Sequence, residues 1–493
     1  MRNRTPLALL LLAAFTGLNT PGQPPAVRSA PAPDPWVAKN RVLVLTDIAN
    51  EPDDQMSMVR FLVYSNEFDV EGLVASTSTW LRNGPRPDVI LKVIEAYDQV
   101  RPNLLKHSPG YPTTQLLRKA VTTGQPSYGM AAVGPDRMSP GAERIIQAVD
   151  DGVRRNDPRP LWITVWGGAN TLAQALLHVR DTRSPADLES FLSHLRVYTI
   201  SDQDDAGPWI RRTFPSLFYI AIPSTPDGQE YYRATWTGIS GDTYYRNGEG
   251  ADFTTFTTPW VDANIRAKGP LGKLYLQPCC IHEGDTPAFL GLINNGLDSF
   301  MSPAWGGWGG RYLWRRPYGE DRPFWTQGGD SFPGRDSSRD TVTGIDGKPH
   351  TSDQATIWRW RTAFQNDFAA RMEWTLGEHG NHNPQVVVNG ESGKAPVIVR
   401  AEPGKPVTLD AADTKDPDGD AVTYHWFFYA EAGAGLPNQP RARGGVTLDR
   451  EDGRVVHATL RASGTAHVIL VVEDKGTPSL TAYRRVILQA TPR

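Results

Sequence analysis

Apolar residues follow two different spacings along residues 41–300, and the two spacings alternate. Short, nearly continuous apolar runs have the length and composition of buried strands. They lie at 42–45, 70–77, 161–166, 197–200 and 217–222. Between them, residues 52–64, 88–100 and 142–155 place apolar side chains three to four positions apart, as on one face of a helix. Strands separated by helices need crossover connections, so the pattern predicts an open, mainly parallel α/β sheet with flanking helices.

Local residues predict two helix starts and one buried helix face. Asn170 precedes TLAQALLHV and is predicted to cap that helix, and Ser184-Pro185 opens the next helix with proline at its first position. Further on, four apolar residues recur every four positions: Trp360, Phe364, Phe368 and Met372. We expect this stripe to pack in the core rather than to hold a ligand.

The pattern changes near residue 381. Residues 36–380 form the predicted α/β domain, whereas 381–493 contain short β-like runs separated by Gly, Pro and Asp, as in an immunoglobulin-like antiparallel β-sandwich. The turn DPDGD at 416–420, followed by a strand with Trp426, resembles polycystic-kidney-disease-type repeats of secreted proteins. Its aspartates are able to bind Ca²⁺, but their preference for turns favours a solvated turn.

The strand at 42–45 runs directly into an acidic loop, TDIANEPDD. Four carboxylates follow within eight residues, and they repel one another unless a cation offsets their charge. The carboxyl ends of parallel strands meet at one rim of a sheet, where ligands bind in open α/β folds. Three other strand ends, at 166–171, 201–205 and 282–286, are also rich in oxygen ligands. Because these ligands are all oxygen, the rim predicts a Ca²⁺ site.

Composition limits the partners and the compartment. Lys plus Arg is 51 and Asp plus Glu is 54, a net charge of −3 that lacks the basic excess of nucleic-acid-binding proteins. No interior apolar run is long enough to span a bilayer. Arg2 and Arg4 precede an apolar run at 7–15 of signal-peptide length, and a Pro/Ala-rich stretch follows at 21–35. We therefore expect residues 1–35 to be a signal peptide and flexible lead-in, and the protein to be secreted or periplasmic.

The two cysteines, Cys279 and Cys280, are neighbours in the sequence. Neighbouring Cα atoms lie about 3.8 Å apart, which is below the usual spacing of a disulfide. We expect two small, partly buried side chains here; a strained vicinal disulfide is the alternative.

Five ordered blocks of the sequence together resemble one bacterial family. They are TDIANEPDDQMS, VASTSTW, ITVWGGANTLAQAL, HEGDTPAFLGLINNGL and PAWGGWGGRY. They are similar to the cellulose-binding Sde182-type proteins, which have a nucleoside-hydrolase-like domain and a β-rich C-terminal domain. The resemblance covers residues 40 to 490 approximately, and it implies a nucleoside-hydrolase-like fold for the α/β domain.

The resemblance also implies roles for the acidic residues. Nucleoside hydrolases hold one Ca²⁺ in an Asp-rich loop, and this ion also binds two sugar hydroxyls and the attacking water. By this analogy Asp47 is a metal ligand and the general base, Asp54 is the bidentate metal carboxylate, and Asp285 is the distal one. The main-chain carbonyl of Trp166 completes the implied metal ligands. Asp53 is implied to act in catalysis by binding a sugar hydroxyl.

Other residues are expected to line a sugar pocket. Asn170 and Asp204 correspond to pocket positions. The segment from Ser76 to Thr79 falls where the family contacts sugar; a simple strand end is the alternative. Exposed tryptophan rings also suit the apolar faces of sugars. Trp80 directly follows this segment, although core packing is favoured for any single tryptophan. In WGGWGG, at 305–310, glycines would leave two rings uncovered, which favours a sugar platform.

Several roles have more than one candidate. The loop from Asp47 to Asp53 is longer than the DxDPGxDD loop of nucleoside hydrolases, so Asn50 or Glu51 is a candidate to share a role in binding substrate. His282 and Glu283 are expected beside the pocket. Either of these two, or Asp205, is a candidate for the acid that protonates the leaving group.

The sequence therefore predicts a secreted Ca²⁺-dependent hydrolase of glycosidic or N-glycosidic bonds. In this reaction a water attacks the anomeric carbon through an oxocarbenium-like transition state. The alternatives are a non-catalytic protein that binds cellulose or another plant polysaccharide, and a periplasmic nucleoside hydrolase. The intact set of four aspartates favours catalysis, since binding alone needs no base beside the metal.

Overall fold

The computed structural model describes residues 30–33, 39–224, 231–240, 245–277, 281–317, 319–327, 338–436 and 440–490. Most of the predicted signal peptide and lead-in, and both cysteines, lie outside these residues. Within them, no helix combines the length and apolarity that crossing a bilayer requires.

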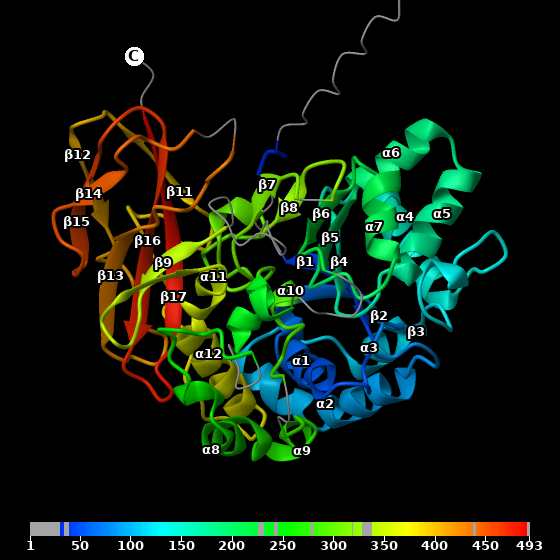
Figure 1. Ribbon diagram of the computed structural model, residues 1–493. Helices are drawn as coiled ribbons and strands as arrows, with labels where there is room; N and C mark the ends of the chain where they lie inside the picture. Colours follow the sequence, from blue (N-terminus) through cyan, green and yellow to red (C-terminus); the bar gives the residue numbers. More distant parts are fainter. Residues whose placement is uncertain are drawn as a thin grey trace, which may run out of the picture.

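One eight-stranded sheet forms the centre of the α/β part (Figure 1). Its strand order is β3-β2-β1-β4-β5-β6-β8-β7, and every neighbouring pair is parallel except β7 with β8. The strands are β1 Asn40–Thr46, β2 Phe68–Ala75, β3 Val121–Thr123, β4 Leu161–Val165, β5 Leu195–Thr199, β6 Phe218–Ala221, β7 Leu313–Arg315 and β8 Phe324–Thr326. The prediction of a mainly parallel α/β sheet is confirmed, and β1 lies near its middle.

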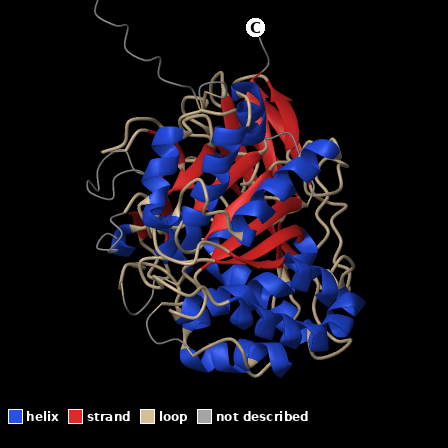
Figure 2. Cartoon of the chain, turned by 90° about the vertical axis from the view of Figure 1, so that its right-hand side faces the viewer, coloured by secondary structure: helices blue, strands red, loops and turns tan. Residues whose placement is uncertain are grey.

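Helices cover both faces of this sheet. On one face lie α1 Pro52–Val63, α2 Pro87–His107 and α12 Arg361–Trp374, and on the other lie α4 Pro140–Arg154, α5 Asn170–Thr182, α6 Pro185–Ser193 and α7 Ala206–Thr213. Figure 2 shows the strands enclosed between helices. The remaining helices are short: α3 Thr114–Ala120, α8 Thr258–Val261, α9 Gly269–Gly272, α10 Pro287–Leu290 and α11 Ala355–Trp358.

Strand β1 shows why its sequence is a nearly continuous apolar run. Val42 and Val44 belong to the core under α1, whereas Leu43 and Leu45 belong to the core under α4 and α5. Successive side chains of a strand point to opposite faces, so a strand covered on both sides must be apolar throughout. The apolar run ends at Leu45, and the first carboxylate, Asp47, follows β1 at the rim.

The C-terminal part is a β-sandwich of two sheets. One sheet has the order β11-β17-β16-β13, the other β12-β15-β14. The strands are β11 Val397–Ala401, β12 Pro406–Asp410, β13 Val422–Phe428, β14 Val446–Leu448, β15 Val455–Leu460, β16 Thr465–Asp474 and β17 Thr481–Ala490. Its pairs are antiparallel apart from β11 with β17, which is parallel. Trp426 is fully buried in the core between the sheets.

The expectation of a sugar platform in WGGWGG is wrong. Trp305 and Trp308 are each 2% exposed, and they pack between the α/β part and the sandwich. The Trp308 indole donates to the Tyr483 hydroxyl at 3.3 Å, and the Trp305 ring meets the His467 ring edge-on. The adjacent glycines allow close approach, because a side chain at Gly306 would overlap the Tyr429 ring. They bring two domains together instead of uncovering two rings.

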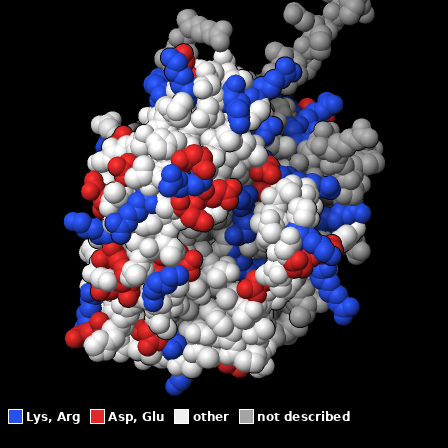
Figure 3. Space-filling view, turned by 90° about the vertical axis from the view of Figure 1, so that its left-hand side faces the viewer, with Lys and Arg blue, Asp and Glu red and all other residues white. Residues whose placement is uncertain are grey.

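The stripe on α12 is buried, as predicted. A two-stranded hairpin of β9 Asp340–Thr343 and β10 Pro349–Ser352 lies beside α11. On the sandwich side of the molecule, acidic and basic side chains are interspersed over the surface (Figure 3). This mixture agrees with the nearly balanced composition.

Candidate metal centre

The acidic loop links the end of β1 to the start of α1. Thr46, the last residue of β1, donates its hydroxyl to the Asp54 carboxylate and accepts the Ile48 amide at 3.1 Å. Pro52 occupies the first turn of α1, where its missing N–H is not needed. Asp53 and Asp54 also lie in that turn, where the helix dipole favours negative charge.

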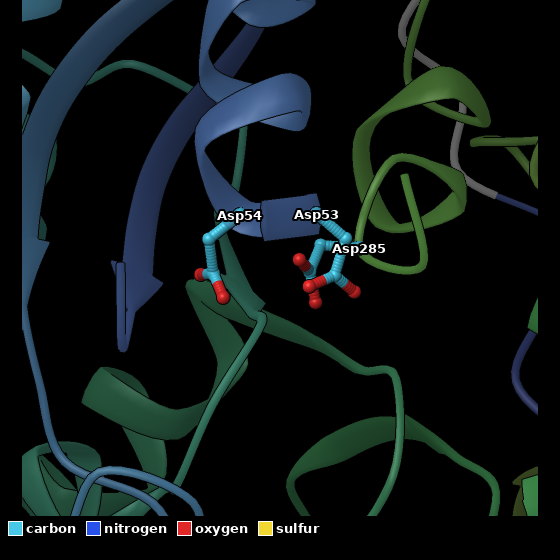
Figure 4. A group of neighbouring side chains, drawn as sticks. All are labelled: Asp53, Asp54 and Asp285. Carbon is cyan, nitrogen blue, oxygen red and sulfur yellow. The ribbon is translucent and has the colours of Figure 1, made fainter. Parts of the chain in front are cut away.

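Three aspartates meet at this point. Oxygen atoms of Asp53, Asp54 and Asp285 all lie within 4.8 Å of one another, and the three side chains are 6%, 3% and 3% exposed. Figure 4 shows them gathered at the start of α1, with Asp285 arriving from a segment more than 200 residues further along the chain. Asp53 therefore joins the cluster itself, beyond the sugar contact predicted for it.

The cluster lacks a counter-charge from the described residues. Asp53 Oδ1 and Asp285 Oδ2 are buried and have no hydrogen-bond partner there. Burial, and then the charge of Asp47, raise the pKa of Asp53 to about 7. Burial and the charges of Asp54 and Asp53 raise the pKa of Asp285 as well. Isolated buried carboxylates are costly, so the arrangement calls for a cation.

Asp47 lies beside these three carboxylates and is held in place from one side. The Ser78 hydroxyl donates to Asp47 Oδ2, and that same hydroxyl accepts the main-chain amides of Trp80 and Leu81 at 2.9 and 3.1 Å. Asp47 Oδ1 is buried and has no hydrogen-bond partner in the described part of the chain. A Cβ at Gly167 would overlap this oxygen, which explains why glycine follows β4 here. Thr46 is thus a site residue that the sequence analysis missed. Ser78 lies in the segment predicted to contact sugar, and its contact with Asp47 was not foreseen.

Glu283 supports the loop that carries Asp285. Arg60 contacts both of its carboxylate oxygens, at 2.6 and 3.0 Å, and the Tyr275 and Thr286 hydroxyls donate to them at 2.6 and 2.8 Å. Three residues thus engage both oxygens of Glu283 and hold the carboxylate in the loop, away from a role with a sugar or a leaving group.

Asn170 and Asp204 join neighbouring strand ends. Asn170 is the first residue of α5 rather than its cap, and its side-chain amide donates to the Ser127 carbonyl at 2.8 Å and the Thr77 hydroxyl at 3.2 Å. Asp204 accepts the amides of Asn170 and Ala206 at 3.0 and 2.9 Å. Burial raises the pKa of Asp204 to about 7. Both side chains are almost fully buried and fix the loops around the cluster.

Gln203 links two other predicted site residues. Its side-chain amide donates to the Trp166 carbonyl at 2.6 Å, and its main-chain carbonyl accepts the Thr79 amide at 2.8 Å. The carbonyl predicted to bind the metal is therefore engaged by a protein donor. The neighbouring Trp80 is 39% exposed, and its ring lies 6.4 Å from that of Tyr231.

The remaining predicted residues differ in their surroundings. Asn50 is exposed at the loop tip. Burial and the charges of Asp53 and Asp47 raise the pKa of Glu51 to about 8. The His282 ring stacks on Phe256 at 5.5 Å, and burial lowers its pKa to about 4, so it is neutral at pH 7. Asp205 precedes α7 and accepts the Met130 amide at 2.8 Å.

Comparison with known proteins identifies the chain. Residues 41–312 match the family described as cellulose-binding Sde182, nucleoside hydrolase-like domain, and residues 406–490 match the cellulose-binding protein Sde0182, C-terminal domain. The first match alone covers more than half of the chain. The chain belongs to the Sde182 family.

A solved structure similar to this Sde182-family chain is a nucleoside hydrolase-related hypothetical protein from Saccharophagus degradans that is associated with carbohydrate metabolism. The two are 34% identical with a TM-score of 0.76, over 92% of this chain and 100% of that one. The PKD domain of the KIAA 1837 protein also matches, at 20% identity over 24% of this chain and 98% of that domain, but the TM-score is only 0.16. No curated protein matches.

The residues of the Sde182-family site fit a hard divalent cation. The three clustered carboxylates are all-oxygen ligands, and their partnerless oxygens are what such an ion binds. Asp53, Asp54 and Asp285 are the residues that would hold it, with Asp47 beside them.

Proposed function

We propose that this protein is a Ca²⁺-dependent hydrolase that cleaves a glycosidic or N-glycosidic bond of a carbohydrate. The observation that carries the proposal is the cluster of Asp53, Asp54 and Asp285 at the carboxyl end of a parallel sheet, with partnerless oxygens buried in it. Family membership supports the carbohydrate class, because the family is described as cellulose-binding with a nucleoside hydrolase-like domain. Export, expected from the N-terminal sequence, favours a polymer-derived substrate over salvaged nucleosides.

Asp47 is the proposed general base. Its Oδ2 is oriented by Ser78, which leaves the buried Oδ1 free to accept a proton from the water that attacks the anomeric carbon. As the bond to the leaving group breaks, positive charge develops on the sugar ring, and nearby carboxylates stabilise it. A bound Ca²⁺ would supply the positive charge that the clustered carboxylates need. It would also offer coordination positions for sugar hydroxyl groups.

The walls of the proposed substrate site come from three strand ends. Ser78, Trp80 and Thr79 follow β2, Gly167 follows β4, and Gln203 follows β5. Trp80 is the exposed aromatic ring of this set, and it is the proposed contact for a sugar face. Glu283 is held by Arg60, Tyr275 and Thr286, and His282 is neutral at pH 7, so the proposal assigns neither as the proton donor.

The test is a panel of cello-oligosaccharides, xylo-oligosaccharides and pentose nucleosides, assayed in Ca²⁺, in EDTA and after Ca²⁺ is restored. We expect turnover of one carbohydrate class that EDTA abolishes and Ca²⁺ restores. Asp47→Asn should lower kcat by about 10² to 10⁴ while Ca²⁺ binding is kept, the range for loss of a general base. Asp54→Asn should lose Ca²⁺ binding itself.

A matched control is Asp136→Asn, which removes an exposed carboxylate before α4. It should leave turnover and Ca²⁺ binding unchanged. Ca²⁺-dependent binding of sugar without turnover of any substrate would instead identify a non-catalytic carbohydrate-binding protein. Full activity of Asp54→Asn in EDTA would rule out the metal centre.

A further inference from the structure

A second group of buried oxygen atoms without partners lies where the chain enters the sandwich. Asn381 lies on the connecting segment, residues 375–396, which joins α12 to β11. Asp416 lies in the turn before β13, and Asp474 ends β16. Asn381 is 7% exposed and Asp474 is fully buried. The three residues come from three separate segments, and none belongs to the α/β metal centre.

Asp474 uses only one of its carboxylate oxygens. Its Oδ1 accepts three hydrogen bonds, from the Gly476 amide at 2.9 Å, the Leu480 amide at 3.0 Å and the Asn381 side chain at 2.9 Å. Its Oδ2 is buried and has no partner among the described residues. A buried acceptor left without a donor costs about 1–3 kcal/mol, and more when it is charged.

The side-chain amide of Asn381 has a fixed orientation. Its two N–H groups have two acceptors, Asp474 Oδ1 at 2.9 Å and the Pro478 carbonyl at 2.8 Å. Reversing the amide would place an oxygen against both acceptors. Asn381 Oδ1 therefore stays an acceptor. Like Asp474 Oδ2, it is buried and finds no partner within the described residues.

Asp416 repeats the arrangement of Asp474. Its Oδ1 accepts the amides of Asp418 and Asp420 at 2.9 and 3.0 Å, whereas its Oδ2 is buried without a partner among the described residues. The turn that carries Asp416 lies against the segment of Asn381, because the amide of the next residue, His382, donates to Asp418 in that turn. Burial raises the pKa of the Asp474 carboxyl, and the charge of Asp416 adds to that rise. Asp418 does not share this role, because it accepts the main-chain amide of His382 at 2.8 Å and contacts the His382 ring at 3.0 Å.

We propose that Asn381 Oδ1, Asp416 Oδ2 and Asp474 Oδ2 bind a divalent cation, with Ca²⁺ as the ion, at the junction of the connecting segment and the sandwich. Three acceptors with two negative charges and no donor require a positive partner, and all-oxygen ligands select Ca²⁺. Water and main-chain carbonyls complete its usual six to eight ligands. The turn that sequence reasoning assigned to solvent becomes one wall of a metal site.

This ion would fasten the connecting segment to the sandwich. One ligand lies on the segment and two lie on the sandwich, so bound Ca²⁺ opposes their separation. The segment is also tied to α12, because the Trp374 indole donates to the Asn381 carbonyl at 3.0 Å. The ion therefore stiffens the boundary between the two domains, whether or not the α/β site is catalytic.

The test measures Ca²⁺ bound per full-length chain by equilibrium dialysis with ⁴⁵Ca²⁺. Asp416→Asn and Asp474→Asn are the variants, because Asn keeps the Oδ1 acceptor and removes the charge. Each should lose one bound ion per chain or weaken its affinity at least tenfold. The control Asp413→Asn removes an exposed carboxylate near the same turn and should bind as the wild type does.

Asp54→Asn separates the two proposed sites. In that background, Tb³⁺ emission excited through tryptophan should persist, and adding Asp416→Asn should abolish it. If Asp474→Asn fails to fold, Asp416→Asn in its surface turn tests the same ion. Wild-type Ca²⁺ binding by a folded Asp416→Asn chain would overturn the proposal, as would loss of all bound Ca²⁺ and Tb³⁺ in Asp54→Asn alone.

Discussion

Two buried acidic groups of this protein are neutralised in opposite ways. Asp340, at the start of β9, accepts Arg311 at 2.8 Å, Arg359 at 2.8 Å and the Tyr429 hydroxyl at 2.6 Å. Burial alone would raise its pKa, but the two arginine charges hold the pKa below its ordinary value. Asp53 is also buried, beside other carboxylates, and its pKa is raised to about 7.

The difference in charged neighbours separates a structural role for Asp340 from the role proposed for Asp53. Around Asp340 the chain supplies its own cations, and Tyr429 comes from the sandwich, so the group joins two domains. Around Asp53 the described residues supply no cation, which is why a bound metal ion is proposed there. The structural carboxylate is complete in the folded chain, whereas the carboxylates of the proposed metal centre are not.

The largest expected change in stability comes from Asp340→Asn. Removing one charge leaves Arg311 and Arg359 buried without their anion, and breaking such a buried pair costs about 3–5 kcal/mol. Urea unfolding should show this loss of unfolding free energy both in buffer with Ca²⁺ and in buffer with EDTA. An equal loss in Asp136→Asn, or none in Asp340→Asn, would contradict the comparison.

Stability without metal should depend on pH because the pKa values of Glu51 and Asp53 are raised to about 8 and about 7. Unfolded, these groups titrate near pH 4. The folded state thus binds more protons between about pH 4 and pH 8, and the free energy of unfolding falls as pH rises through that window. Thermal unfolding in EDTA measures this fall.

Saturating Ca²⁺ is the control for that pH series. The ion favours the ionised carboxylates, so the fall between pH 4 and pH 8 should disappear. The same fall with and without Ca²⁺ would show that no ion binds the cluster.

Asp53→Asn should have opposite effects in the two conditions. In EDTA at pH 8 it removes a repelled buried charge and should stabilise the fold by about 1–3 kcal/mol. In Ca²⁺ it removes a ligand and should lower the stabilisation that the ion confers. The change in Tm relative to the wild type, measured in each buffer, gives the sign of each effect. A lower Tm of the variant in EDTA at pH 8 would contradict the repulsion inferred for Asp53.

The smallest expected effect belongs to Trp80→Ala. Loss of an aromatic contact is worth about 0.5–1.5 kcal/mol, so KM should rise about 2- to 12-fold with kcat little changed. Kinetics on the substrate found in the panel measure it. Trp209→Ala, a half-exposed ring on α7 that packs on Phe214, is the matched control and should leave KM unchanged.

Short-range patterns predicted much of the fold. The strand at 42–45, the helix beginning near residue 52 and the buried stripe on α12 all follow from local spacing, and the structure contains them. Ser184 caps α6, as its Ser-Pro sequence indicates, by accepting the Asp187 amide at 3.2 Å. The prediction of Asn170 as a cap was wrong, because its side chain instead donates to Thr77, after β2, and to Ser127, after β3.

Long-range partners were harder to predict. Glu283 was expected at the pocket because it adjoins Asp285, but its partner Arg60 lies 223 positions away. The WGGWGG tryptophans are covered by the sandwich, whose approach no local pattern indicates. In both cases the deciding contact joins residues that the sequence separates widely.

The sequence by itself determined that carboxylates gather at the end of a buried strand, because the apolar run and the acidic loop are adjacent. It also determined the family, through five ordered blocks. Only the tertiary structure decided which oxygens meet: Asp285 beside Asp53 and Asp54, and Asn381 beside Asp474. Burial and hydrogen bonding depend on every segment that packs around an atom, so an oxygen left without a partner becomes visible only in the folded chain.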